Sequence, residues 1–352
     1  MIKISIDKEI GTSHWDWFKE RANRHFQNTR TSYKDFIIND LKISWNNVKE
    51  IITGNIETLN TFKYRLGKIT KQMDENRYNK LMCAFGYENF CDSQKEWNAY
   101  KMCQELKISV CPYCNREYTF TIGDVNNKGV RPEIDHFFPK SDYPYLSCSL
   151  YNFIPSCHIC NHGKRDFGEG ILYPYKEKFG INFPFRVKFG KESGKSNDLI
   201  NIDNVQVFFD NKDCKTNQTK REICQKCLKI QKSIKTFHLE RIYNEHKIEL
   251  KDLFDRYRNY CQPKRKDILR LFHEDELKKR IDGLTETQIN RILSLYAKKM
   301  KNMFLGLPLG AEGKEYPLRK FKEDIIEQFD TTQRKMEKKT TNSIRKRLAK
   351  TR

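Results

Sequence analysis

The sequence lacks both a membrane-spanning run and an export signal. No stretch of 18 consecutive apolar residues occurs, which argues against a transmembrane helix. The opening residues, MIKISIDKEI, lack the long apolar run of a secretory signal. Hydrophobic residues make up only 38% of the 352, yet 23 Phe, 17 Tyr and 4 Trp provide enough large apolar surface for a core. We therefore expect a globular cytoplasmic protein that does not contact a membrane.

Negative charge is scarce relative to positive charge. The chain has 67 Lys and Arg against 46 Asp and Glu, so its net charge is +21. Such a chain attracts polyanions because their condensed counterions are released on binding. Nucleic acid is therefore the leading partner class, although a Lys-rich composition also arises from a biased genome. No base-reading motif is evident, so DNA is favoured only weakly over an RNA such as tRNA.

The twelve cysteines are not spaced as a disulfide framework of a short secreted chain. Cys111 and Cys114 form one C-x-x-C pair, and Cys157 and Cys160 form another. A two-residue gap lets both thiolates of a pair face one tetrahedral ion, and two pairs complete a four-ligand shell. These four cysteines therefore predict a structural zinc site in a reducing compartment.

The other cysteines carry weaker signals. Cys224 and Cys227 form a third pair with Cys214 nearby but no evident fourth ligand, so a second zinc site there is left open. The remaining cysteines are most simply interpreted as free structural thiols: Cys83, Cys91, Cys103, Cys148 and Cys261.

Composition and periodicity divide the chain into five expected segments. They are a helical region 1–105, the cysteine-bracketed segment 106–167, a small β-rich segment 168–235, a helical region 236–330 and a basic disordered tail 331–352. This pattern predicts an α+β protein, mostly α.

Local signals predict individual elements. Helices are expected over 33–41 and 45–70, from a capping box at Ser93–Glu96, from about Cys157 and Lys229, from a capping box at Thr285 and from Pro317. Strands are expected over 117–122 and 131–138, joined as a hairpin, and at 185–189 and 205–209. His246 on an apolar helix face is interpreted as a hydrogen-bonded core histidine.

Between the two cysteine pairs, Asp135 directly precedes His136. Phosphodiester hydrolysis needs a deprotonated water and a cation beside the leaving oxygen. A histidine with a pKa near 6.5 is a competent general base at neutral pH. An aspartate offers the hard oxygen that Mg²⁺ or Mn²⁺ prefers. The pair predicts a metal-assisted phosphodiesterase in which His136 activates water and Asp135 binds the ion.

Further residues of this segment complete the predicted site. Asn161, on the helix that follows Cys157, is the expected second protein ligand of the catalytic ion, and His162 is an alternative ligand. Asn152 is expected to orient His136 by a hydrogen bond. Lys164 and Lys140 are expected to contact substrate phosphates. His158 is interpreted as a surface residue.

The string C-x-x-C…D-H…N…C-x-x-C-N-x-x-K resembles the HNH, or ββα-metal, endonuclease family. The resemblance implies a zinc-stabilised hairpin and helix around one catalytic ion, embedded here between helical regions, with Asp135, His136, Asn152 and Asn161 in the family's site positions. Many members have His where this chain has Asn161.

Residues 95–330, including Phe237–His246, resemble more weakly the HNH effectors of Septu-type and retron-associated anti-phage systems. That similarity implies a defence nuclease with a partner ATPase. The alternatives are an RNA-cleaving effector, a restriction-type HNH enzyme outside defence, and a zinc-stabilised nucleic-acid-binding module without catalysis.

Overall fold

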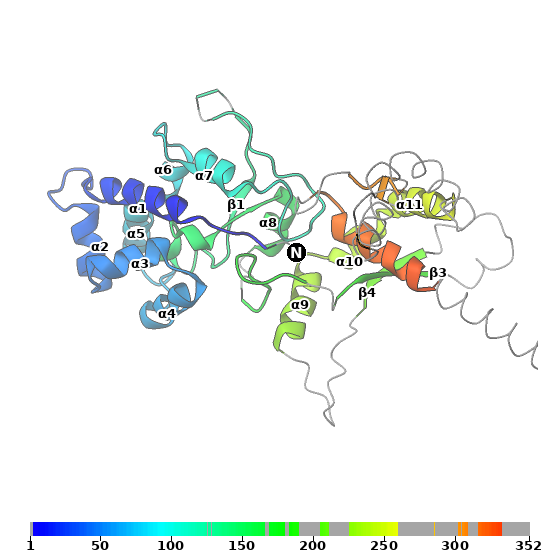
Figure 1. The fold of residues 1–352 in the computed structure, drawn as a ribbon. Coiled ribbons are helices and arrows are strands. Elements are labelled where there is room, and N and C mark those ends of the chain that lie inside the picture. Colours follow the sequence, from blue (N-terminus) through cyan, green and yellow to red (C-terminus); the bar gives the residue numbers. More distant parts are fainter. Residues whose placement is uncertain are drawn as a thin grey trace, which may run out of the picture. The chain divides into compact units, whose positions relative to one another are not determined.

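The computed structural model describes residues 3–124, 126–127, 129–165, 169–179, 183–189, 205–210, 225–259, 285, 302–303, 305–308 and 316–332 (Figure 1). The chain divides into two compact units. The first comprises Met1–Ile181 with Asp213–Leu239, and the second comprises Asn182–Lys212 with Glu240–Arg352. The first unit therefore joins the helical N-terminal region and the cysteine-bracketed segment in one body.

Seven helices precede the first cysteine pair within the described residues. They are α1 (Lys8–Ala22), α2 (Tyr33–Leu41), α3 (Trp45–Thr53), α4 (Ile56–Leu66), α5 (Glu75–Phe85), α6 (Tyr87–Cys91) and α7 (Ala99–Leu106). Several begin at a polar N-cap whose side chain accepts a backbone N–H, as Ser32 does from Asp35 at 3.0 Å. These caps explain why polar segments with short apolar stripes form separate helices.

Two helix predictions need correction. The expected helix over 45–70 is two helices, because the chain turns at Gly54 and Asn55 caps a new helix by accepting the Thr58 N–H at 3.1 Å. The helix that leads to the cysteines begins at the N-cap Asn98 and not at the Ser93–Glu96 capping box. The Asn98 side chain accepts the Lys101 N–H at 3.0 Å, so it satisfies the helix end in place of Ser93.

The core of the first unit is strongly aromatic. Phe90 stacks on Phe153 with ring centroids 5.7 Å apart, and Trp17 meets Phe90 edge-on at 5.0 Å. Phe18 and Phe85, from α1 and α5, are fully buried and lie 5.7 Å apart. The helical region thus packs directly on the strand that carries Phe153, which gives the site a rigid support.

The sheet of the first unit has two strands, β1 (Glu133–His136) and β2 (Phe153–Ser156), paired antiparallel. Two 3₁₀ turns, η1 (Pro144–Leu146) and η2 (Leu150–Asn152), lie in the connection, and α8 (His158–Lys164) follows β2. Helix α8 contacts β1. The helix predicted to begin near Cys157 is confirmed, with Cys157 as its N-cap.

The partner predicted for β1 was wrong. Residues 117–122 form only isolated bridges, Tyr118 with Val110 and Ile122 with Val130. Tyr118 and Ile122 are 59% and 67% exposed, whereas every residue of β2 is buried. Pairing with β2 therefore removes more apolar surface from water than the expected hairpin would.

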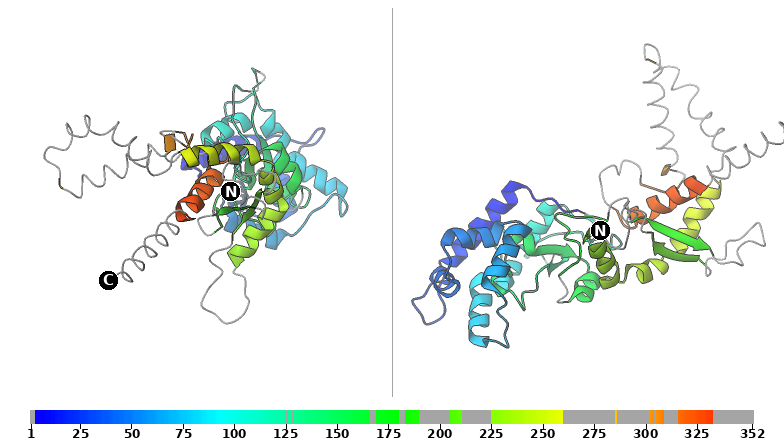
Figure 2. Two further views of the ribbon diagram at one scale, coloured as in Figure 1. Left: turned by 90° about the vertical axis from the view of Figure 1, so that its right-hand side faces the viewer. Right: turned by 90° about the horizontal axis from the view of Figure 1, so that it is seen from below.

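The second unit contains β3 (Phe185–Phe189) and β4 (Val205–Phe209), the strands expected at these residues, and they pair antiparallel. Its helices are α10 (Leu239–Asn244), α11 (Lys247–Asn259) and a helix over residues 319–332, while α9 (Gln225–Thr236) belongs to the first unit. Figure 2 shows α11 beside the helix 319–332, where Phe254 meets Phe329 at 5.0 Å.

Polar side chains bind the outer edges of β3 and β4. Gln328 bonds both the N–H and the carbonyl of Val187 at 2.9 Å, and Asn244 does the same for Val207 at 2.9 Å. These amides satisfy edge groups that would otherwise remain open to another strand. His246, predicted as a core residue, is half-buried and pairs with Glu249 at 3.1 Å.

Several predictions lie outside the described residues: the helix from Thr285, the cysteines Cys214, Cys224 and Cys261, and the tail beyond residue 332. Cys227 is buried on α9. Among the helices that the structure describes, none combines the length and the apolar character needed to cross a membrane.

Candidate metal centre and catalytic site

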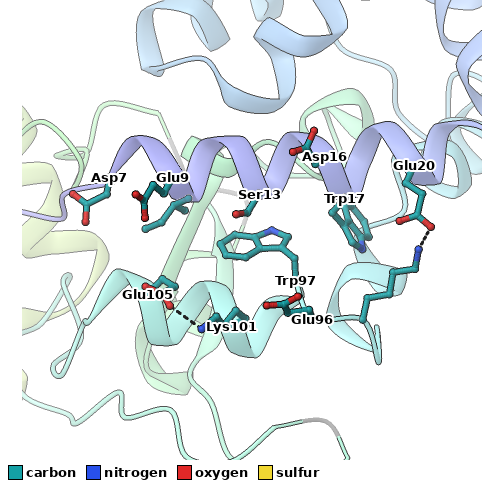
Figure 3. Close-up of a pocket in the computed structure, with 12 residues that line it drawn as sticks. Asp7, Glu9, Ser13, Asp16, Trp17, Glu20, Glu96, Trp97, Lys101 and Glu105 are labelled. Atoms are coloured by element: carbon teal, nitrogen blue, oxygen red, sulfur yellow. Dashed lines mark hydrogen bonds and ion pairs between the residues drawn. The ribbon is translucent and has the colours of Figure 1, made fainter.

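A groove of about 600 Å³ lies between α1 and α7 in the first unit (Figure 3). Trp17 and Trp97 contribute to its lining, together with six acidic residues: Asp7, Glu9, Asp16, Glu20, Glu96 and Glu105. Lys95 and Lys101 also line it, each paired with one of these carboxylates. The surplus of negative charge repels phosphates, so this groove does not fit a nucleic-acid substrate.

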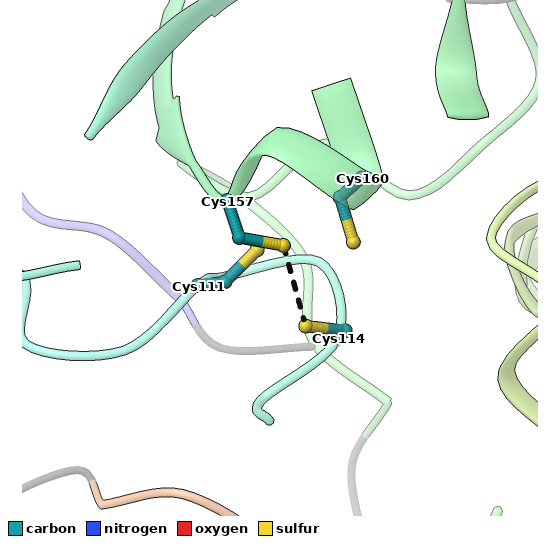
Figure 4. A group of neighbouring side chains, drawn as sticks. All are labelled: Cys111, Cys114, Cys157 and Cys160. Carbon is teal, nitrogen blue, oxygen red and sulfur yellow. Dashed lines mark hydrogen bonds between the residues drawn. The ribbon is translucent and has the colours of Figure 1, made fainter. Parts of the chain in front are cut away.

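The four cysteines of the two C-x-x-C pairs meet at one point (Figure 4). Their sulfur atoms all lie within 4.8 Å of one another, and the Sγ atoms of Cys114 and Cys157 are 3.9 Å apart. A tetrahedral zinc with Zn–S bonds of about 2.3 Å places its sulfurs about 3.8 Å apart. The cluster could therefore hold a metal ion such as zinc, as the sequence predicted.

Local backbone geometry forms the first half of this cluster. The Asn115 N–H donates to the Cys111 carbonyl at 2.9 Å, and Asn115 has a φ of 53°, a left-handed conformation that Asn tolerates. Hydrogen bonds from neighbouring thiols, first that of Cys111, lower the pKa of Cys114 and of Cys157. Burial raises the pKa of Cys111, and the hydrogen bond with Cys111 raises that of Cys160, so these two thiols would release their protons only as a metal ion binds.

Tyr113, inside the first pair, links the cluster to β1. Its side chain is fully buried, stacks on Phe237 at 4.4 Å and donates its hydroxyl to Asp135 Oδ2 at 2.6 Å. Burial raises the pKa of Tyr113 well above its ordinary value, so the phenol keeps its proton. Sequence reasoning missed this residue, whose only signal was an aromatic side chain between two metal ligands.

The predicted catalytic residues Asp135 and His136 lie on opposite faces of β1, because the side chains of successive strand residues point to alternate sides. Asp135 faces α8, where it accepts a hydrogen bond from Lys164 Nζ at 3.0 Å. His136 faces α6, where its ring meets the Tyr87 ring edge-on at 4.5 Å. The structure therefore does not bring the Asp135 carboxylate and the His136 imidazole to one face of the strand.

His136 is held as a neutral imidazole with one defined tautomer. Its side chain is 8% exposed, and Nε2 lies 2.8 Å from the Ser147 carbonyl oxygen. A carbonyl only accepts, so Nε2 carries the proton and Nδ1 carries the lone pair. Burial lowers the pKa of His136 to about 3, and the nearby ammonium groups of Lys140 and Lys164 act in the same direction.

The Asn152 side chain bonds backbone groups and not the His136 ring, which corrects the predicted direct hydrogen bond. Its Oδ1 accepts the Phe138 N–H at 2.7 Å, and its Nδ2 donates to the carbonyls of Phe138 and Leu146, both at 3.0 Å. Asn152 thereby holds together the two ends of the connection between β1 and β2. Ser147, next to Leu146, supplies the carbonyl that orients His136, so Asn152 acts on His136 through the backbone.

The two predicted phosphate-binding lysines lie in different environments. Lys164 is fully buried and donates to Asp135 and, at 2.7 Å, to the His136 carbonyl. Its ammonium is thus the counter-ion of a buried carboxylate and does not reach the surface. Lys140 is partly exposed, pairs with Glu88 at 2.6 Å and lies 4.5 Å from the centre of the Tyr87 ring. Only Lys140 lies where a phosphate could approach it.

A second ligand cluster spans β1 and α8. The carboxylate of Glu133 accepts from His158 Nδ1 at 2.7 Å and from Asn161 Nδ2 at 2.7 Å. The His158 and His162 rings lie 4.0 Å apart. Ligand atoms of Glu133, His158 and His162 lie within 4.8 Å of one another. Sequence reasoning missed Glu133, although it is two residues before Asp135 and so on the same strand face.

The predicted catalytic ion does not fit between Asp135 and Asn161 as they stand. Both oxygens of Asp135 already accept hydrogen bonds, from Tyr113 and from Lys164. Burial raises the pKa of Asp135, and the Lys164 ammonium opposes that rise. Asn161 directs its amide to Glu133 and not to Asp135. The two predicted ligands therefore serve two separate contacts between β1 and α8.

Comparisons with known proteins give one partial relative. No family model matches the chain, and no solved structure matches it. Protein ea31 of Escherichia phage lambda is 34% identical over 74 residues, which is 19% of this chain and 21% of the phage protein. The chain thus spans about a fifth of the length of this relative, a match too short to show a family.

Proposed function

We propose that this protein is a metal-dependent phosphodiesterase of the HNH type that hydrolyses nucleic acid, with DNA favoured as substrate. The observation that carries the proposal is the orientation of His136. A neutral imidazole is fixed by the Ser147 carbonyl at Nε2, and the turn that supplies this carbonyl is held by Asn152. The succession of β1, β2 and α8, with one cysteine pair before β1 and the other at the start of α8, agrees with the ββα-metal arrangement that the sequence resembles.

In the proposed reaction His136 is the general base. Nδ1 takes a proton from a water molecule, whose oxygen forms a bond to phosphorus while the bond from phosphorus to the leaving oxygen breaks. The leaving oxygen takes a proton from solvent. General-base catalysis by a positioned histidine contributes roughly 10²–10⁴-fold to such a rate. A pKa of about 3 keeps His136 unprotonated throughout the neutral range, but it also makes the imidazole a weaker base than an ordinary histidine, so its contribution to the rate is expected at the low end of the range for general-base catalysis.

Positive charge beside His136 favours a phosphate there. Lys140 is near enough to lower the pKa of His136, and its ammonium is partly exposed. A phosphate oxygen would compete with Glu88 for that ammonium. The net charge of +21 adds a long-range attraction for a polyanion. The expected role of Lys140 as a phosphate contact is therefore kept in the proposal.

The two metals of the proposal differ in how well the residues present could bind them. Structural zinc fits the four cysteines, which would hold it and join the Cys111 turn to α8. A catalytic Mg²⁺ or Mn²⁺ is implied by the resemblance, but Asp135 and Asn161 are not arranged to share it. No step of the reaction is therefore assigned to that ion.

The test is cleavage of plasmid DNA, single-stranded DNA and total tRNA by the purified full chain, with Mg²⁺, Mn²⁺ or EDTA. We expect metal-dependent cutting that His136→Ala reduces at least 100-fold, while His25→Ala, an exposed histidine, leaves it unchanged. Equal cutting by wild type and His136→Ala would refute the role of His136. The substrate that is cut distinguishes a DNase from an RNase.

One observation favours a second candidate, a zinc-stabilised nucleic-acid-binding module without catalysis. Lys164 neutralises Asp135, the residue expected to bind the catalytic ion, and a purely structural role explains that ion pair. Salt-sensitive binding of DNA with no cleavage in any metal would support this alternative. The defence role and the partner ATPase rest on the resemblance alone, and failure to co-purify with an ATPase encoded next to it would count against them.

A further inference from the structure

The cluster of Glu133, His158 and His162 has the geometry of a metal site. Its three ligand groups lie within 4.8 Å of one another, on two elements that already contact each other. We propose that these residues bind a divalent transition-metal ion of the Zn²⁺, Ni²⁺ or Cu²⁺ type, at a site separate from the four cysteines. The proposal goes beyond the proposed hydrolysis and does not depend on it.

The helical spacing of the two histidines supports the site. His158 and His162 are four residues apart on α8, so both rings lie on one face one turn apart. Two histidines with this spacing on a helix can bind one zinc ion together, as they do in zinc metalloproteases. The rings are already close, with centroids 4.0 Å apart, so little rearrangement is needed to bind an ion.

The third ligand is held in place before any ion binds. Asn161 donates to Glu133 Oε2 at 2.7 Å, which fixes one oxygen of the carboxylate while the other faces His158. Hydrogen bonds of this kind orient the ligands of a metal from outside its coordination shell. Asn161, predicted as a ligand itself, is assigned here to positioning Glu133.

The chemistry of the donors selects the class of ion. Two imidazoles and one carboxylate suit Zn²⁺, Cu²⁺ and Ni²⁺, whereas Mg²⁺ prefers oxygen ligands alone. Both histidines are exposed and Glu133 is half-buried, so an ion reaches the site from solvent without unfolding. Three protein ligands also leave a coordination position for water or another molecule.

The alternative is a surface hydrogen bond between His158 and Glu133 that needs no ion. The two explanations differ in the role of His162, which a simple pair does not require. They also differ in stoichiometry, since a metal site adds one equivalent of ion to the equivalent bound by the cysteines.

The experiment is a calorimetric titration of the full chain with ZnCl₂, after elemental analysis has shown the zinc content of the purified protein. We expect wild type to bind one further equivalent, and His158→Ala and His162→Ala to bind it at least tenfold more weakly. His246→Ala is the matched control. His246 also pairs with a glutamate, but among the described residues it forms no ligand cluster with a second histidine. It should bind like wild type.

A thermal melt provides a second measurement that does not depend on calorimetry. A ligand that binds only the folded state raises the melting temperature of the protein. Free Zn²⁺ should therefore raise the melting temperature of wild type and of His246→Ala, and should leave the melting temperature of His162→Ala unchanged. Absence of a further equivalent in wild type, or equal binding by His162→Ala, would overturn the proposal. Neither result bears on nucleic-acid cleavage, which is measured separately.

Discussion

Helix α8 contributes to two ligand clusters that differ mainly in burial. Cys157 and Cys160 belong to a cluster in which three of the four thiols are buried, whereas His158 and His162, interleaved with them, are exposed. The same seven-residue helix thus has one face toward the protein interior and one toward solvent. Because solvent screens the exposed histidines but not the buried cysteines, we expect the cysteines to carry stability and the histidines to carry little.

The largest effect is expected from loss of a cysteine ligand. Cys157→Ser places at the N-cap of α8 a residue that favours that position but removes one thiolate, and structural zinc can contribute about 10–16 kcal/mol to folding a small module. We expect loss of the bound zinc and a fall in melting temperature of about 10 °C or more, measured by elemental analysis and circular dichroism. Cys83→Ser, at an exposed thiol, is the control and should change neither. Full zinc content in Cys157→Ser would contradict a four-cysteine site.

The next effect concerns the buried ion pair between β1 and α8. Lys164→Met leaves the Asp135 carboxylate, only 4% exposed, without its counter-ion, which typically costs about 3–5 kcal/mol. Urea denaturation should show this loss, and the double variant with Asp135→Asn should recover part of it. Lys140→Met removes a partly exposed pair and should cost less than about 1 kcal/mol. Similar losses for both lysines would contradict the role of Lys164 as the buried counter-ion of Asp135.

Acid should destabilise the first unit through two buried histidines. Burial lowers the pKa of His14 to about 4 and that of His136 to about 3, both below the ordinary value of 6.5. The unfolded chain therefore binds more protons below pH 6.5, so stability is fully present above that pH and falls as pH decreases toward 4. From pH 7 to pH 5 we expect a loss of about 2 kcal/mol for each histidine, or about 4 kcal/mol together.

This pH dependence can be assigned to its source with one variant. His14 accepts the Trp97 indole N–H at Nδ1 and bonds the Cys148 carbonyl through Nε2, so its ring is neutral by the same argument as for His136. His14→Gln removes one titrating group and should reduce the slope of unfolding free energy against pH by about half. An unchanged slope would mean that groups other than His14 cause the pH dependence of stability.

The smallest effect on stability is expected at the exposed cluster. Glu133→Gln weakens the pair with His158, whose side chain is 68% exposed, and exposed pairs contribute about 0–1 kcal/mol. The free energy of unfolding, measured by urea denaturation without added metal, should therefore change by less than about 1 kcal/mol. A loss as large as that of Cys157→Ser would show that both clusters are structural and would remove the contrast between them.

Much of the local structure around the site could be predicted from the sequence. The spacing of the cysteines located their cluster, the alternation at 185–189 and 205–209 located β3 and β4, and the start of α8 at Cys157 was confirmed. The strand and helix predictions succeeded because each depends on a pattern within a few residues, and the cysteine prediction succeeded because one tetrahedral ion needs four ligands. The pairing of β1 with β2 could not be predicted in this way, because it depends on which distant strand buries more apolar surface.

The sequence by itself determined which side chains are available: four cysteines in two pairs, an Asp-His pair between them and an Asn and a Lys on the following helix. The tertiary structure alone decided how they are used. Alternation along β1 sends Asp135 to Lys164 and His136 to the Ser147 carbonyl, and it places Glu133 beside His158 and Asn161. The physical reason is that residue type specifies what a group can bind, whereas its strand face and burial specify which partner it meets.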